Sequence, residues 1–288
     1  MEYINKQSLI SQLKTYKKNP LSLFLFLSVL FAAVFTFSAL LFLVGYILFK
    51  GIPNLSLDLF AWKYNSENVS LMPALFNTLI MVLLSLLISA PLGIFSAIYL
   101  VEYAKRDNKI VGIIRLTSET LSGIPSIVYG LFGLLFFVTT LGWGFSLLAG
   151  AFTLAIMILP LIMRTTEEAL KSVPSSYREG SFGLGAGKLR TIFKIVLPSA
   201  LPGILAGIIL AIGRIVGETA ALIYTAGTVA EVPSSLLSSG RTLAIHMYAL
   251  SSEGLHTNEA YATAVVLIII VLLINWFSAY VAKKIVKG

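Results

Sequence analysis

Arg214 and Glu218 lie inside a long apolar stretch, Gly203 to Ala221, where charged side chains are least expected. The planar guanidinium of arginine can hold a phosphate-like oxyanion through paired hydrogen bonds. Charged residues within membrane-spanning segments are costly and mark substrate or ion pathways. The two residues therefore predict an anion pathway, in which Arg214 attracts the anion and Glu218 keeps binding weak enough for release.

The spacing of these residues predicts that they share one helical face. On a single helix, Arg214 and Glu218 would line a stripe with the small residues Gly203, Gly207 and Ala211, near the middle of the fifth spanning helix. Such a stripe is expected to face protein or water and not lipid. The same spacing allows a second interpretation, a static ion pair that holds the helix bundle together.

Composition identifies an integral membrane protein. Of 288 residues, 57% are hydrophobic and only 12% are charged, and the mean hydropathy is +0.91. Soluble domains carry about 25% charged residues.

The absence of cysteine excludes disulfides and thiolate metal sites. His246 and His256 have no ligand-spaced partners, so we expect neither a metal nor a cofactor.

Uncharged runs predict an all-α protein with six transmembrane helices. The basic head before the first run resembles a signal peptide, but the run exceeds the usual apolar core of about 7 to 15 residues, so a retained helix is expected. Pro125 is expected to break the third helix near its start, as a kink or as an anion contact. The expected helices cover Leu21–Phe49, Asn68–Val101 with a bend at Pro91, two parts of Thr120–Met163 divided at Gly142–Gly144, a fifth from Pro198 through Ala221, and Ala260–Ala282.

The distribution of basic residues predicts the orientation. Only Lys50, Lys63 and Arg241 fall on one face, and the other basic residues outside the membrane fall on the opposite face. Because positive charge marks cytoplasmic loops, both termini are expected in the cytoplasm. Residues 1–20 then form a cytoplasmic segment and residues 21–288 a transmembrane domain. Orientation accounts for the net charge of +8 without nucleic acid.

Residues 164–198 form the largest basic loop, and they predict a helical hairpin on the cytoplasmic face. Ser176 and Glu179 have the spacing of a capping box at the start of a first short helix. Gly185 and Gly187 allow a tight reversal of the chain before a second short helix.

The hairpin sequence resembles permease subunits of binding-protein-dependent ABC importers. Their motif, E-A-A-x3-G-x9-I-x-L-P, is matched by Glu179, Gly185, Ile195, Leu197 and Pro198, although Gly180 and Ser181 replace the two alanines. The resemblance implies a MetI-like permease fold and a hairpin that docks on a separate ATPase subunit. For Glu179, the alternative is a helix cap alone.

Four further runs resemble phosphate importer permeases, and two of them favour one of the two permease subunits of that group. The resemblance implies a partner permease, two ATPase subunits, an external phosphate-binding protein and a multi-pass location in a bacterial or archaeal plasma membrane. The runs are residues 77–105, which end in APLGIFSAIYLVEYAK, SGIPSIVYG (122–130), TTEEALKSVP (165–174) and GRIVGETAALIYTAG (213–227).

The chain is not expected to be an enzyme. The run GLGAGKL (183–189) lacks the spacing of an ATP-binding loop, because Phe182 and Leu189 stand where glycine and Ser or Thr are required. ATP hydrolysis is therefore expected in another subunit.

Two alternative functions stay open. The first is an ABC permease for another oxyanion such as sulfate, molybdate or phosphonate. The second is a secondary transporter or channel that uses the Arg/Glu pair as a proton relay.

Overall fold

The computed structural model describes residues 19–105 and 108–287, and all regular structure within them is helical. The chain divides into two units at Lys50. The first contains α2 (Pro20–Gly51), a long apolar helix. Residues 1–18 of the expected cytoplasmic segment, and Arg106, lie outside the described residues.

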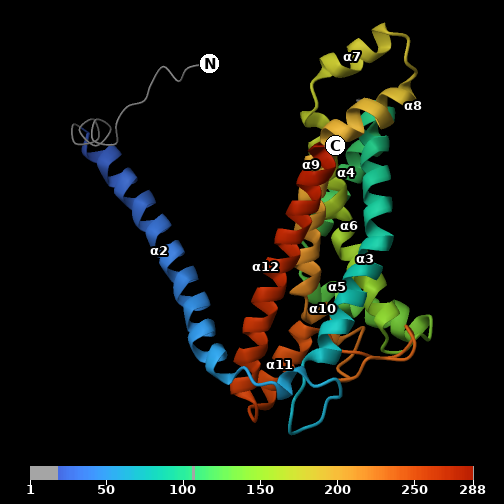
Figure 1. Cartoon of the computed structure of the whole chain (residues 1–288). Coiled ribbons are helices and arrows are strands. Elements are labelled where there is room, and N and C mark those ends of the chain that lie inside the picture. Colours follow the sequence, from blue (N-terminus) through green and yellow to red (C-terminus); the bar gives the residue numbers. More distant parts are fainter. Residues whose placement is uncertain (1–18, 106–107, 288) are drawn as a thin grey trace. The chain divides into compact units, whose positions relative to one another are not determined.

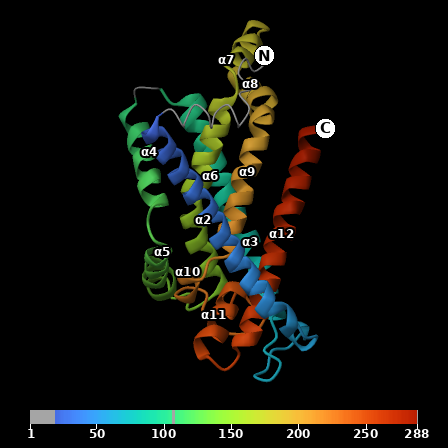
Figure 2. The same cartoon turned by 90° about the vertical axis from the view of Figure 1, so that its left-hand side faces the viewer.

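The second unit is a bundle of long helices with short helices at both ends (Figures 1 and 2). The helical hairpin and the end of the last long helix lie at one end of this bundle. The long elements are α3 (Met72–Ile98), α4 (Lys109–Ser122), α6 (Leu147–Ser172), α9 (Leu197–Val216) and α12 (Thr257–Lys287). The short ones are α5 (Ser126–Gly133), α7 (Ser175–Gly183), α8 (Lys188–Thr191), α10 (Ala220–Ile223) and α11 (Leu243–Glu253).

Within the described residues, five helical segments are long and apolar enough to cross a membrane. A sixth span results when α4 is combined with α5 and the π-helical turn Leu134–Thr140, which are bent by 100° relative to α4. The expected number of six agrees with this count. Gly142 and Gly144 adopt positive φ angles, and the predicted division between the third and fourth spans is confirmed there.

The predicted bounds of the third, fourth and fifth spans are wrong, and the sixth is longer than expected at both ends, Thr257–Lys287 in place of Ala260–Ala282. The third span begins at Lys109 and not near Thr120, so Pro125 lies at a break in its middle and not near its start. The fourth continues through Ser172, past its expected end at Met163 and into the expected loop. Both differences arise because α4 and α6 carry charged residues within the helices, where these residues form ion pairs. The fifth ends at Val216.

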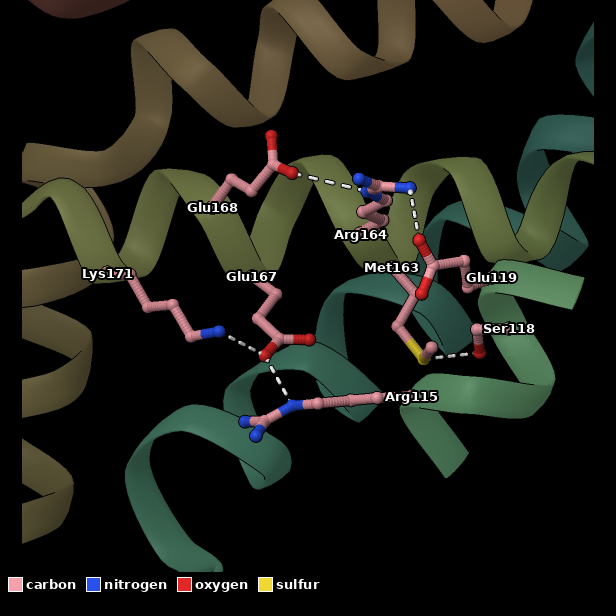
Figure 3. A pocket seen from close by; sticks show the side chains of 8 residues that line it. All are labelled: Arg115, Ser118, Glu119, Met163, Arg164, Glu167, Glu168 and Lys171. Atoms are coloured by element: carbon pink, nitrogen blue, oxygen red, sulfur yellow. Dashed lines mark hydrogen bonds and ion pairs between the residues drawn. The ribbon is translucent and has the colours of Figure 1, made fainter. Parts of the chain in front are cut away.

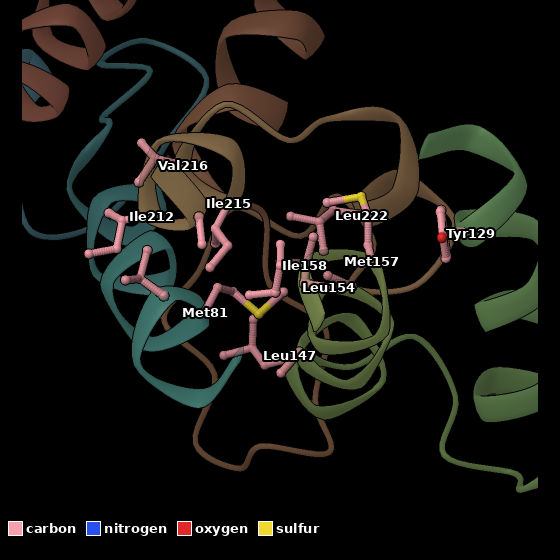
Figure 4. Packing of buried hydrophobic residues seen from close by; sticks show 14 of the residues in the cluster. Met81, Tyr129, Leu147, Leu154, Met157, Ile158, Ile212, Ile215, Val216 and Leu222 are labelled. Carbon is pink, nitrogen blue, oxygen red and sulfur yellow. The ribbon is translucent and has the colours of Figure 1, made fainter. Parts of the chain in front are cut away.

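The core lies between α3, α6 and α9 (Figure 4) and includes Met81, Leu154, Ile158 and Ile215. Small residues allow α9 to approach α6 closely, as the stripe predicted. A Cβ atom on Gly207 would lie 2.1 Å from Thr165 Oγ1, which is far inside van der Waals contact. The close packing fixes the position of α9, which carries Arg214.

Candidate functional site

Arg214 lies in the last turn of α9. It is therefore at the end of this helix away from the hairpin, and the expected position near the middle is wrong. Its side chain is partly buried and forms no hydrogen bond or ion pair with any residue in the described ranges. A cation at a helix C-terminus gains about 0.3 to 1 kcal/mol from the helix dipole. The dipole provides no hydrogen bond for the guanidinium donors, and a charged side chain in a membrane-spanning segment is costly when it is unpaired. Arg214 therefore needs a further partner.

Glu218 does not provide that partner, and the predicted ion pair between Arg214 and Glu218 is absent from the described structure. The α-helix stops at Gly217, a residue of low helix propensity, so Glu218 leaves the shared stripe that we predicted. Its Oε1 accepts a hydrogen bond from the backbone N–H of Ala221 at 3.0 Å. Glu218 thus caps the start of α10.

Helix α5 forms the neighbouring wall of the site. Its Tyr129 lies within the electrostatic range of Arg214, and the Tyr129 hydroxyl donates a hydrogen bond to the Leu121 carbonyl at 2.8 Å, across the break between α4 and α5. A Cβ on Gly130 would lie 2.8 Å from the Ala221 Cα, so α5 and α10 pack backbone to backbone. The surroundings of Arg214 are therefore rigidly built.

The hairpin is present as predicted. Helices α7 and α8 are joined by a turn in which Gly185 has φ +81°, and Ser181 and Thr191 are hydrogen-bonded across it at 2.8 Å. Gly185 and Ile195 line one pocket of about 320 Å³. Glu179, Leu197 and Pro198 lie outside that pocket.

The predicted capping box is wrong. Helix α7 begins at Ser175 after Pro174, with no side-chain cap, so Ser176 already lies inside the helix. Pro174 is the N-cap residue and keeps a non-helical backbone, with φ −55° and ψ 140°. Glu179 is exposed and has no hydrogen bond or ion pair in the described part of the chain. Its side chain is therefore free for a contact outside the chain.

Arg178 anchors the hairpin to the bundle, and the sequence did not indicate this. Its Nη2 lies 2.6 Å from Glu102 Oε1, in the π-helical turn Tyr99–Tyr103. The same guanidinium donates hydrogen bonds to the carbonyls of Leu170 at 3.0 Å and Val173 at 2.9 Å, at the end of α6. One side chain thus ties α7 to α3 and α6.

A charged cluster between α4 and α6 was also missed (Figure 3). Glu167 Oε1 lies 2.7 Å from Arg115 Nε and 2.6 Å from Lys171 Nζ. Arg164 pairs with Glu168 at 3.2 Å and with Glu119 at 3.9 Å. The three- and four-residue spacing of charges in both segments was the available signal.

His246 lies in the short helix α11, outside the spanning segments, and is fully buried. Burial, and secondarily the charge of Arg241, lowers its pKa to about 3. In the unfolded chain His246 has a pKa near 6.5, so on acidification the unfolded state binds the proton at a higher pH than the folded state does. The free energy of unfolding is therefore at its full value above about pH 6.5 and falls as the pH drops toward 3. At pH 5 we expect a loss of about 2 kcal/mol.

The measurement is the thermal midpoint of the detergent-purified protein at pH 7.5 and pH 5. The difference in thermal midpoint between pH 7.5 and pH 5 should be smaller in His246→Gln than in the wild type, whereas His256→Gln should leave it unchanged. An equal difference in the wild type and His246→Gln would assign the acid sensitivity to other groups.

Comparisons with known proteins agree with this architecture. A family model described as "binding-protein-dependent transport system inner membrane component" matches residues 89–287. The probable ABC transporter permease YqgI of Bacillus subtilis is 35% identical over 264 residues, 84% of this chain and 90% of the relative. The phosphate transport system permease PstA of Pasteurella multocida is 36% identical over 278 residues, 91% and 93% of the two chains.

Two solved structures share the fold. The inward-facing MetNI methionine ABC transporter matches with a TM-score of 0.59 and 20% identity, over 75% of this chain and 94% of that one. A bacterial alginate ABC transporter in complex with an alginate pentasaccharide-bound periplasmic protein matches with a TM-score of 0.68 and 17% identity. The match covers 95% of this chain and 98% of that one.

Proposed function

This chain belongs to the family of binding-protein-dependent transport system inner membrane components, and we propose that it is the PstA-like permease subunit of an ATP-driven phosphate importer. As an ABC importer permease it is a multi-pass plasma membrane protein and a transport component, not an enzyme. The observation that carries the choice of substrate class is the guanidinium of Arg214, which lies in a spanning segment and has no hydrogen bond or ion pair among the described residues.

Arg214 is the proposed contact for phosphate. Its guanidinium presents paired N–H donors to the oxygens of a tetrahedral anion. The partly buried position strengthens the attraction relative to bulk water. Glu218 borders the same pathway, where its carboxylate fixes α10 and its negative charge opposes tight retention of the anion. A partner permease would supply the opposite wall.

The hairpin is the proposed contact for an ATPase subunit. Glu179, Gly185, Ile195, Leu197 and Pro198 keep the coupling role that their motif implies. The helical element Lys188–Val216 runs from the hairpin to Arg214, so a displacement at the hairpin has a direct mechanical route to the anion. Arg178 transmits the same displacement to α3 through Glu102.

The decisive test is reconstitution of this chain in liposomes with its partner permease and ATPase subunits. We expect uptake of phosphate that requires both ATP inside and a phosphate-binding protein outside. Excess sulfate, molybdate or phosphonate should leave it unchanged. Uptake of one of these anions in place of phosphate would change the substrate, and phosphate uptake without ATP would favour a secondary transporter.

A further inference from the structure

The charged cluster between α4 and α6 lines a pocket of about 180 Å³ (Figure 3). Arg115, Ser118 and Glu119 contribute from α4, and Arg164, Glu167, Glu168 and Lys171 contribute from α6. Both helices belong to segments long and apolar enough to span a membrane. The charged residues lie toward the hairpin end of α6, where Lys171 stands in the last turn, and they pair across the two helices.

Glu167 and its two cations differ in their access to this pocket. The Glu167 side chain is 8% exposed, whereas those of Arg115 and Lys171 are 40% and 53% exposed. Both cations approach the same oxygen, Glu167 Oε1. The Nη atoms of Arg115 form no hydrogen bond with any residue in the described ranges. One carboxylate oxygen therefore engages two cations, and donors remain free to bind another anion.

The pocket lies on the route from Arg214 to the hairpin end of the bundle. Tyr129, which is within the electrostatic range of Arg214, is hydrogen-bonded to Leu121 near the end of α4. Arg115 is six residues before Leu121 on this helix, which corresponds to about 9 Å. Lys171 stands in the last turn of α6, which leads directly to the hairpin.

We infer that this pocket is a second, low-affinity anion site, from which the transported anion is released on the hairpin side. The inference rests on the proposed function. Arg115 and Lys171 donate to the anion, and Glu167 competes with it for the same two cations. Because the pocket is lined by as many carboxylates as cations, the anion meets no deep energy well, and the return of Glu167 to its ion pairs expels it.

The opposing possibility is that the cluster only ties α4 to α6. Binding of inorganic phosphate to the assembled complex separates the two roles. Every variant is made in the Arg214→Gln background, which removes the proposed phosphate contact at Arg214. The readout is the thermal midpoint in phosphate, relative to the midpoint in chloride of equal ionic strength. Glu167→Gln should lower the phosphate concentration for half-maximal stabilisation about tenfold, because a competing charge is gone. Arg115→Gln should abolish the stabilisation.

Transport gives an independent readout with Arg214 intact. Phosphate loaded inside the liposomes should inhibit uptake by Glu167→Gln at about tenfold lower concentration than it inhibits uptake by the wild type. Inhibition of Arg115→Gln should need a higher phosphate concentration than inhibition of the wild type. Lys109→Gln, on the same helix but outside the pocket, is the matched control and should behave as the wild type. Unchanged phosphate stabilisation and unchanged inhibition in both pocket variants would overturn the inference. Absence of phosphate uptake by the wild type would overturn only the proposed function, because the binding assay needs no transport.

Discussion

Arg214→Gln is expected to reduce ATP-driven phosphate uptake to the level measured without ATP. The guanidinium forms no hydrogen bond or ion pair with the rest of the described chain, so its removal breaks no contact that holds α9 in place. It also removes a charge from a membrane-spanning segment, where charged side chains are costly. The variant should therefore insert and assemble at least as well as the wild type.

The measurement is the initial rate of phosphate uptake in liposomes, beside the yield of the assembled complex. Arg214→Lys is the matched variant, because it keeps the charge but loses the planar pair of donors. We expect it to retain a small part of the uptake. Normal uptake by Arg214→Gln would remove this residue from the pathway, and a poorly assembled complex would show that its role is structural.

Residues that obey local rules were predictable from the sequence. The apolar runs located the spans because a helix must be about 20 residues long to cross the bilayer. Gly142 and Gly144 located a turn through their positive φ angles. The hairpin followed from glycines between two short helical patterns, and Gly203 and Gly207 correctly predicted the face of α9 that meets α6.

Contacts between helices were not predictable, because periodicity gives the face of a helix but not its register against a neighbour. Arg115 lies ahead of the predicted third span, and its partner Glu167 is distant in sequence. Arg178 gave no sign that it would meet Glu102 and the end of α6. Helix α9 ends where Gly217 follows Val216. This end of the helix separates Arg214 from Glu218.

This separation changes the meaning of the two charges. On one continuous helix they would neutralise each other, and a static ion pair would explain both. In the structure, Glu218 accepts a hydrogen bond from the backbone of α10, whereas Arg214 has no ion pair with any residue between 19 and 105 or between 108 and 287. The break at Gly217 therefore keeps a cation available for the anion, at the cost of a regular helix.

Glu179→Lys is expected to abolish co-purification of this chain with its ATPase subunit. Because Glu179 is exposed and unpaired in the described structure, reversal of its charge leaves the fold of the hairpin intact. The Arg178–Glu102 ion pair and the Ser181–Thr191 hydrogen bond still hold α7 and α8. The loss would therefore report on the docking surface itself, where a misplaced charge costs several kcal/mol.

The matched control is Glu253→Lys, an exposed charge reversal on α11 at the other end of the bundle. It should co-purify with the ATPase at the wild-type level, and both variants should keep the wild-type thermal midpoint as isolated chains. Undiminished co-purification and coupled ATP hydrolysis in Glu179→Lys would reject the docking role. Since the capping box is not formed, Glu179 would then have no role that its position explains.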